Sequence, residues 1–249
     1  MLRLTILLLT AVNTGYAQTG QAQPSRKDSV TVSAGFTKEE LRLADEFDAK
    51  WGAARQLVRN DPKSAVKQLQ ELLSIIAKHT FLEHNRPQIL VTLGNAYLAG
   101  GDAKAAVSVF EQRLHMEDED CRPGAKYPSS CASAQLNLAT AKMSAGESAT
   151  ALDLVRSAVD NFQLQIKLEE PHEANELQHF VDLRKLGEAE LVYGIFLARG
   201  GRWAEAKRVL DECIATSGKI ISNSDVQPSL RTDAQQFIDL AKKQEAALR

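Results

Sequence analysis

The chain of 249 residues has few aromatic side chains, at 6%, and almost no net charge. Its 30 lysines and arginines nearly balance its 32 aspartates and glutamates, which argues against a nucleic-acid-binding protein with a basic face. The balance also gives no reason to expect attraction to an anionic membrane. The apolar run at the N-terminus, residues 4–12, covers about half of the roughly 20 residues that a membrane-spanning helix needs. We therefore expect no nucleic-acid partner and no membrane insertion of the mature chain.

The sequence also lacks the motifs that carry chemistry. No P-loop, G-x-G-x-x-G or G-x-S-x-G string occurs, and none of the five histidines stands four residues from another, so no H-E-x-x-H zinc helix is present. The acidic run at 117–120 has neither the alternate spacing nor the closing glutamate of a calcium loop, and it predicts a solvated acidic loop. We expect no catalytic residue, no cofactor and no metal, and hence no enzyme.

Cysteine is scarce as well, with three residues, and two of them flank a loop. Cys121 and Cys131 enclose a stretch rich in proline, glycine and serine, which favours a disulfide that closes a small loop. Two ligands of a metal site are the alternative, but no third or fourth ligand stands nearby at ligand spacing. Cys213 falls on the apolar side of a predicted helix, where we expect a buried free thiol.

The first 17 residues have the pattern of a secretory signal peptide. Arg3 supplies the positive start, and Gly15 and Ala17 are the small residues before a cleavage site. A retained N-terminal anchor is the alternative. Cleavage after Ala17 leaves a flexible, polar lead-in at 18–36, and the mature chain contains no Asn-x-Ser/Thr sequon. We expect an exported protein, periplasmic or secreted, in a compartment that permits a disulfide.

From residue 37 onward the sequence predicts helices. Thr37 and Glu40 form the T-x-x-E pattern of a capping box, which opens a helix. All prolines fall in predicted loops or at helix starts, as a chain of helices requires. They are Pro24, Pro62, Pro87, Pro123, Pro128, Pro171 and Pro228. A last apolar face predicts a C-terminal capping helix within 225–249, and it consists of Leu230, Ala234, Phe237, Ile238 and Ala241.

Four segments share one spacing of small and large residues. Each has a small residue, a turn residue seven positions later, an alanine after 12 and a large apolar residue after 16. We expect the alanine to face the small residue, the turn residue to end the first helix in the left-handed conformation, and the large residue to fill the space between hairpins. The four sets are Ala53, Asn60, Ala65 and Leu69; Gly94, Gly101, Ala106 and Phe110; Ala139, Gly146, Ala151 and Val155; and Gly194, Gly201, Ala206 and Leu210.

This pattern resembles the tetratricopeptide repeat. The second segment matches best, because it also has Leu93 and Tyr97, whereas Gln56, Lys142 and Leu197 replace the tyrosine elsewhere. Other helical-hairpin solenoids share parts of the pattern. The small residues are 41, 45 and 55 apart instead of 34, which is similar to the long repeats of kinesin light chains. The resemblance implies an all-α, right-handed superhelical solenoid of about four antiparallel hairpins at 37–222, with 172–199 as one long helix.

The resemblance also implies a peptide-binding groove lined by the first helix of each hairpin. The predicted groove residues are mainly apolar, and they are Val91, Asn95, Leu98, Leu136, Asn137, Thr140, Met143, Leu191 and Ile195. Asn95 and Asn137 match the asparagines of a carboxylate clamp in the family. Glu188 and Val192 stand where its basic residues belong, so we expect no such clamp.

The expected function is therefore that of an interaction module with a protein or peptide partner held in the groove. A structural role, in which the groove serves self-association into a homo-oligomer, is the alternative. An enzyme of unrecognised type is a third and weaker hypothesis.

Overall fold

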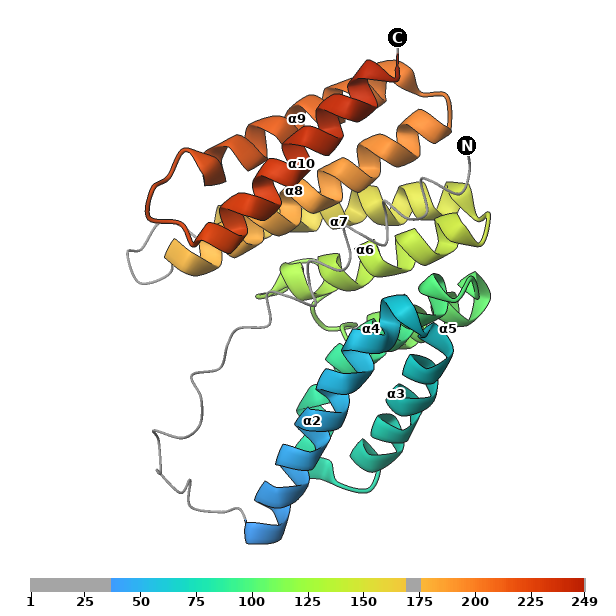
Figure 1. Cartoon of the computed structure of the whole chain (residues 1–249). Helices are drawn as coiled ribbons and strands as arrows, with labels where there is room; N and C mark the ends of the chain where they lie inside the picture. Colours follow the sequence, from blue (N-terminus) through green and yellow to red (C-terminus); the bar gives the residue numbers. More distant parts are fainter. Residues whose placement is uncertain (1–36, 169–175, 249) are drawn as a thin grey trace. The chain divides into compact units, whose positions relative to one another are not determined.

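The computed structural model describes residues 37–168 and 176–248, which fold into nine α-helices and one short 3-10 helix, without a β-strand (Figure 1). This confirms the predicted all-α class. The predicted signal peptide, the lead-in segment, Pro24 and Pro171 lie outside the described residues. The elements are α2 (Lys38–Asn60), α3 (Pro62–Ile76), η3 (Thr80–Asn85), α4 (Arg86–Ala99), α5 (Ala103–His115), α6 (Pro128–Ser144), α7 (Ser148–Leu168), α8 (Glu176–Arg199), α9 (Trp203–Ile221) and α10 (Pro228–Ala246).

The chain divides into two compact units, one up to Arg113 and one from Leu114 onward. Unit 1 contains the hairpin α2–α3, then η3, and the hairpin of α4 with nearly all of α5. Unit 2 contains the hairpins α6–α7 and α8–α9, and α10 packs against both α8 and α9 (Figure 1). The predicted apolar face of α10 is buried, as expected of a capping helix.

Each unit has its own buried apolar clusters. In unit 1 one cluster joins all of its α-helices, with Phe47 of α2, Leu69 of α3, Ile89 of α4 and Val109 of α5 among its members. In unit 2 a cluster of Leu183, Ile220, Val226, Leu230 and Ala234 ties α8, α9 and α10 together. Burial of these side chains is the main force that holds each set of helices together.

The helices begin where the sequence predicts them. The Thr37 amide donates to Glu40 Oε2 at 2.7 Å and the Glu40 amide donates to Thr37 Oγ1 at 3.2 Å, which confirms the capping box. The Thr37 backbone bond lowers the pKa of the exposed Glu40 carboxyl below its usual value. Proline stands in the first turn of α3, α4, α6 and α10, where its missing N–H costs no hydrogen bond.

Three of the four hairpin turns follow the predicted glycine rule. Gly101, Gly146 and Gly201 have φ values of 82°, 88° and 74°. In each turn the amide after the glycine donates to the carbonyl five residues back, which closes a Schellman motif. These bonds run from Asp102 to Tyr97 at 2.9 Å, from Glu147 to Lys142 at 2.8 Å, and from Arg202 to Leu197 at 3.0 Å.

The first hairpin departs from the spacing rule. Helix α2 continues through Asn60 and α3 begins at Pro62, so only Asp61 separates them, and no non-glycine residue in the described ranges has a positive φ. The prediction that Asn60 takes the left-handed conformation is therefore wrong. Ala53 is exposed and Ala54 is fully buried, so the small residue of this hairpin is Ala54, although Ala54 is one position later than predicted.

Where the small residue of a hairpin is a glycine, it lies against the large residue that follows it by 16 positions. A Cβ atom on Gly94 would lie 2.7 Å from Phe110 Cε2 and closer still to Cζ, and one on Gly194 would lie 2.7 Å from Leu210 Cγ. The large residue after 16 positions thus covers the small residue within its own hairpin. At Gly194 the alanine partner also comes near, through the Ala206 carbonyl at 3.5 Å. The small residue is needed because a large side chain rests on it.

Helix α8 is the long helix predicted at 172–199, and its first described residue is Glu176. No helix in the part of the chain that the structure describes combines the length and the apolar character needed to span a bilayer.

Candidate functional site

Most of the predicted groove residues are buried, which corrects the groove prediction. Leu191 is fully buried, and the other buried positions are Leu98, Leu136, Asn137, Thr140 and Ile195. In unit 2 the reason is plain for α8, because this helix packs against α6, α7, α9 and α10. Side chains that fill such contacts form the core and are not available to a ligand. The prediction stays open for Val91, Asn95 and Met143, which are half-buried.

The two asparagines of the family's clamp have different surroundings. Asn137 is only 9% exposed, whereas Asn95 is half-buried and its Oδ1 atom is enclosed without a hydrogen-bond partner. Glu188, which stands where a basic clamp residue belongs, is buried as well. Asn137 and Glu188 are thus buried and not exposed to a ligand.

Cys121 and Cys131 form a disulfide, with 5.1 Å between their Cα atoms. Cys131 is buried in the first turn of α6, and Cys121 is exposed at the end of the acidic loop. The Asn161 side-chain amide of α7 lies 3.8 Å from Cys131 Sγ, so the bridge ties the loop to the α6–α7 hairpin. Cys213 is free and buried, and burial raises the pKa of its thiol to about 12, so it is unreactive in the closed fold.

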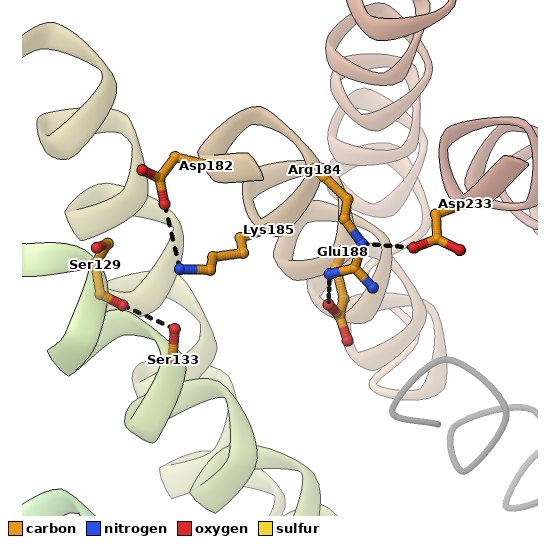
Figure 2. Close-up of polar contacts among 7 residues, drawn as sticks. All are labelled: Ser129, Ser133, Asp182, Arg184, Lys185, Glu188 and Asp233. Carbon is orange, nitrogen blue, oxygen red and sulfur yellow. Dashed lines mark hydrogen bonds and ion pairs between the residues drawn. The ribbon is translucent and has the colours of Figure 1, made fainter. Parts of the chain in front are cut away.

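A set of buried charges lies along α8 in unit 2 (Figure 2). The Arg184 guanidinium donates to Asp233 of α10 at 2.7 Å and to Glu188, one turn along α8, at 3.2 Å. It also stacks over the Phe237 ring of α10, 5.7 Å from its centroid. Arg184 therefore fastens α10 to α8 by charge as well as by packing.

A second pair on α8 points toward another part of the unit (Figure 2). Asp182 is fully buried. Its carboxylate accepts a hydrogen bond from Lys185 Nζ at 3.3 Å and one from the side-chain amide of Gln178 at 2.8 Å. Figure 2 also draws Ser129 and Ser133 of α6, and the Ser133 hydroxyl donates to the Ser129 carbonyl at 2.8 Å. The Asp182–Lys185 pair thus adds a second buried polar contact to α8.

Burial and charge act in opposite directions on the Glu188 carboxyl. Burial raises its pKa above the usual value, and the Arg184 guanidinium lowers it by a smaller amount. Such a buried ion pair contributes little net stability, but removal of one partner is costly because the other charge stays buried.

The sequence reasoning missed the buried charged residues Asp182, Arg184, Glu188 and Glu190. One signal was available: Arg184 and Glu188 stand four residues apart, which is the spacing of an ion pair on one helix face. The remaining positions from 183 to 198 are almost all apolar, so the helix leaves no wide polar face for these charges. Both facts point to burial of the charged groups.

The described residues hold no cluster of three or more histidine, cysteine, aspartate or glutamate side chains that could bind a metal ion. The ends of α9 and α10 enclose a surface depression of about 390 Å³, lined by Ile221, Pro228, Arg231, Thr232 and Gln235. Its lining contains one cation and no acid, histidine or cysteine, so it lacks the paired groups that general acid–base chemistry uses.

Comparison with known proteins bears directly on the hairpins. The tetratricopeptide repeat family matches at residues 87–112 and 187–212, which contain Gly94 with Phe110 and Gly194 with Leu210. Two crystal structures of nearly identical TPR-like repeats, assigned to a kinesin light chain of Podosopora anserina, are 22% and 21% identical to the chain, with TM-scores of 0.49 and 0.48. Each alignment covers 82% of this chain, and the alignments cover 94% of the first solved chain and 97% of the second. No curated protein matches the chain at a significant level.

Both matched segments contain a glycine turn and a glycine covered by a large side chain, with Phe110 on Gly94 and Leu210 on Gly194. The chain is thus similar to the tetratricopeptide repeat family in two segments, one in the α4–α5 hairpin and one across the α8–α9 turn.

Proposed function

We propose that the protein is an exported interaction module that holds a segment of a partner protein against the first helices of its hairpins. The tetratricopeptide repeats at 87–112 and 187–212 are the observation that carries this proposal. Stacked helical hairpins present extended surfaces, and proteins built from them serve mainly to bind other proteins.

The accessible groups on the first helices favour a peptide over a small charged ligand. Unit 1 presents Val91 and Asn95 on α4, and unit 2 presents Met143 on α6, all of them half-buried. An aliphatic group and a flexible thioether suit a chain segment that carries apolar side chains.

Site-specific photo-crosslinking tests the face that binds. A photoreactive amino acid is placed at Val91 or Met143, and at the exposed positions Ser108 of α5 and Asp160 of α7 as matched controls on second helices. We expect adducts with one partner protein from positions 91 and 143 and none from 108 and 160. Equal adducts from all four positions would contradict the proposal. An adduct of twice the chain mass would favour self-association, the structural alternative.

Export is the second part of the proposal. The signal-like residues 1–17 support it, and a disulfide between Cys121 and Cys131 suits an oxidising compartment. The mass of the purified protein should correspond to a chain that begins at Gln18, and fractionation should place it outside the cytosol. Ala17→Arg should leave an uncleaved precursor, because signal peptidase needs a small residue there, whereas Ser25→Arg should be processed normally. A cytosolic chain that keeps Met1 would refute export.

A further inference from the structure

Helix α8 buries three carboxyl groups, and they differ in their partners. Asp182, Glu188 and Glu190 are at most 2% exposed. Asp182 has Lys185 at 3.3 Å and Glu188 has Arg184 at 3.2 Å as cation partners. Glu190 has no such ion pair among the described residues, and its Oε2 atom is enclosed without a hydrogen-bond partner. An isolated carboxylate in such a place is costly, so the group favours its neutral form.

The surroundings of Glu190 lie in the seam between α8 and α9. The Thr216 side chain of α9 lowers the pKa of the carboxyl by less than burial raises it, and Cys213 of α9 is close enough for the carboxylate charge to act on its thiol. Cys213 donates to the Gly187 carbonyl of α8 at 3.2 Å, and Ser217 is fully buried beside Gly187. The seam thus contains small polar groups, and of these the Thr216 side chain favours the charged carboxyl by less than burial disfavours it.

The charged groups that act on Glu190 all belong to α9. Glu212 disfavours its ionisation and Lys219 favours it, and both effects are smaller than that of burial. In the described parts of α6, α7 and α10, no charged group acts on it; Asp233 of α10 acts on Glu188. Burial therefore dominates and raises the pKa of Glu190 to about 7.

We propose that Glu190 makes the seam between α8 and α9 a proton-controlled joint, closed while the carboxyl is neutral and loosened when it loses its proton. The loosening concerns the second half of α9. The first half is fastened by the Gly201 turn and by Leu210 resting on Gly194. The second half carries Thr216, Ser217 and Ile220, and α10 packs on the same region.

The direction of the pH dependence follows from the two states of the joint. In the open, hydrated state the carboxyl titrates near its usual value of 4.5, and in the closed state it titrates near 7. Opening therefore releases a proton between these values, and the opening constant rises about tenfold per pH unit there. Below pH 4.5 and above pH 7, the ionisation of Glu190 no longer makes the opening constant depend on pH. Acid closes the joint, and alkali loosens it by a factor on the order of 100.

The buried thiol of Cys213 reports on the joint directly. We define the protection of the Cys213 thiol as its labelling rate in the unfolded chain divided by its labelling rate in the native protein at the same pH. Because both rates depend on thiol ionisation in the same way, this dependence cancels in the ratio. We expect this protection to fall on the order of 100-fold between pH 5 and pH 8 in the wild type. Hydrogen exchange of amides from 216 to 221 should fall in protection over the same range, and amides from 203 to 210 should not.

Glu190→Gln keeps the shape of the neutral acid and should fold, with protection that equals the wild type at pH 5 and stays level to pH 8. Glu212→Gln is the matched control, because it removes a nearby carboxylate but leaves Glu190 buried, and it should keep the wild-type dependence on pH. The proposal is overturned if wild-type protection is level from pH 5 to 8, if the Glu190→Gln variant follows the wild type, or if that variant is less protected at pH 5.

Discussion

At the scale of single residues, the repeat depends on the match between a small residue and the large side chain that covers it. Gly94 lies under Phe110 and Gly194 under Leu210. At the same template positions Ala139 accompanies the smaller Val155, and both are fully buried. The sequence predicted the small residue and an alanine opposite it, but not the large side chain that covers it. The alanine and the large residue stand four positions apart on one helix face, and spacing alone cannot tell which of them makes the closest contact.

Gly94→Ala tests this contact. The added Cβ would overlap the Phe110 ring, so the free energy of unfolding should fall by about 1–3 kcal/mol although alanine is the better helix former. Gly52→Ala is the control, because nothing lies within 4 Å of its Cβ position in α2, and it should raise stability by up to about 1 kcal/mol. Urea unfolding measures both. Equal effects of the two substitutions would contradict the contact.

A second variant separates overlap from other causes. Gly94→Ala combined with Phe110→Val imitates the Ala139 and Val155 pair of the third segment. Phe110→Val alone leaves a cavity, but in the double variant the alanine methyl occupies part of that space. The double variant should therefore be more stable than the sum of the single effects predicts, by about 1 kcal/mol or more.

The buried cation Arg184 leads to a prediction with a pH dependence. Arg184→Met keeps much of the volume but leaves Glu188 and Asp233 without their partner, which should cost about 3–5 kcal/mol at pH 7.5. The loss should shrink at pH 5, because burial already raises the pKa of Glu188 and removal of the cation raises it further. Arg156→Met, which breaks an exposed pair with Asp153, should cost less than about 1 kcal/mol. A similar loss in both variants would argue against the role of Arg184.

At the scale of elements, local signals predicted more of the fold than of the site. The capping box at Thr37, the prolines in first helical turns and three glycine turns depend on a few neighbouring residues, so the sequence predicts them directly. The prediction for the first hairpin was wrong because the turn of this hairpin consists of the single residue Asp61 and contains no glycine. The groove prediction was wrong for most residues because the exposure of a helix face depends on which other helices cover it. Leu191 and Ile195 suit a groove by type, yet α8 is surrounded by other helices.

The disulfide of the α5–α6 connection is a testable element of its own. It closes a loop of sequence separation 10, so its removal should lower the free energy of unfolding by about 2–3 kcal/mol through the greater freedom of the unfolded chain. Cys121→Ser should show this loss, and reduction of the wild type should give the same loss. Cys213→Ser is unsuitable as a control because that thiol is buried. Ser130→Ala, in the first turn of α6 and within the segment that the bridge closes, serves instead, with little effect expected.

Thiol counting checks the pairing independently. The unfolded, unreduced protein should show one reactive thiol, that of Cys213, and the reduced protein should show three. Three thiols before reduction would show that the bridge does not form in the isolated protein.

At the scale of the whole molecule, the described chain consists of two compact units, and each has buried apolar clusters of its own. Phe47, Leu69 and Ile89 belong to the cluster of unit 1, and Leu183, Ile220 and Leu230 to a cluster of unit 2. In repeat proteins stability is approximately a sum of local terms, so damage to one cluster need not spread along the chain. The units should therefore differ in how they respond to a change in either core.

Matched core truncations test this expectation. Leu69→Ala and Ile220→Ala each remove a fully buried side chain and should cost about 2–5 kcal/mol in the unit concerned. Hydrogen exchange should show lost protection in α2, α3 and α4 for Leu69→Ala, with α8, α9 and α10 unchanged, and the reverse for Ile220→Ala. Equal loss of protection in both units from either substitution would mean that the chain unfolds as one cooperative body. Separate responses would mean that Glu190 can loosen the joint between α8 and α9 while the α4–α5 repeat of unit 1 keeps its fold.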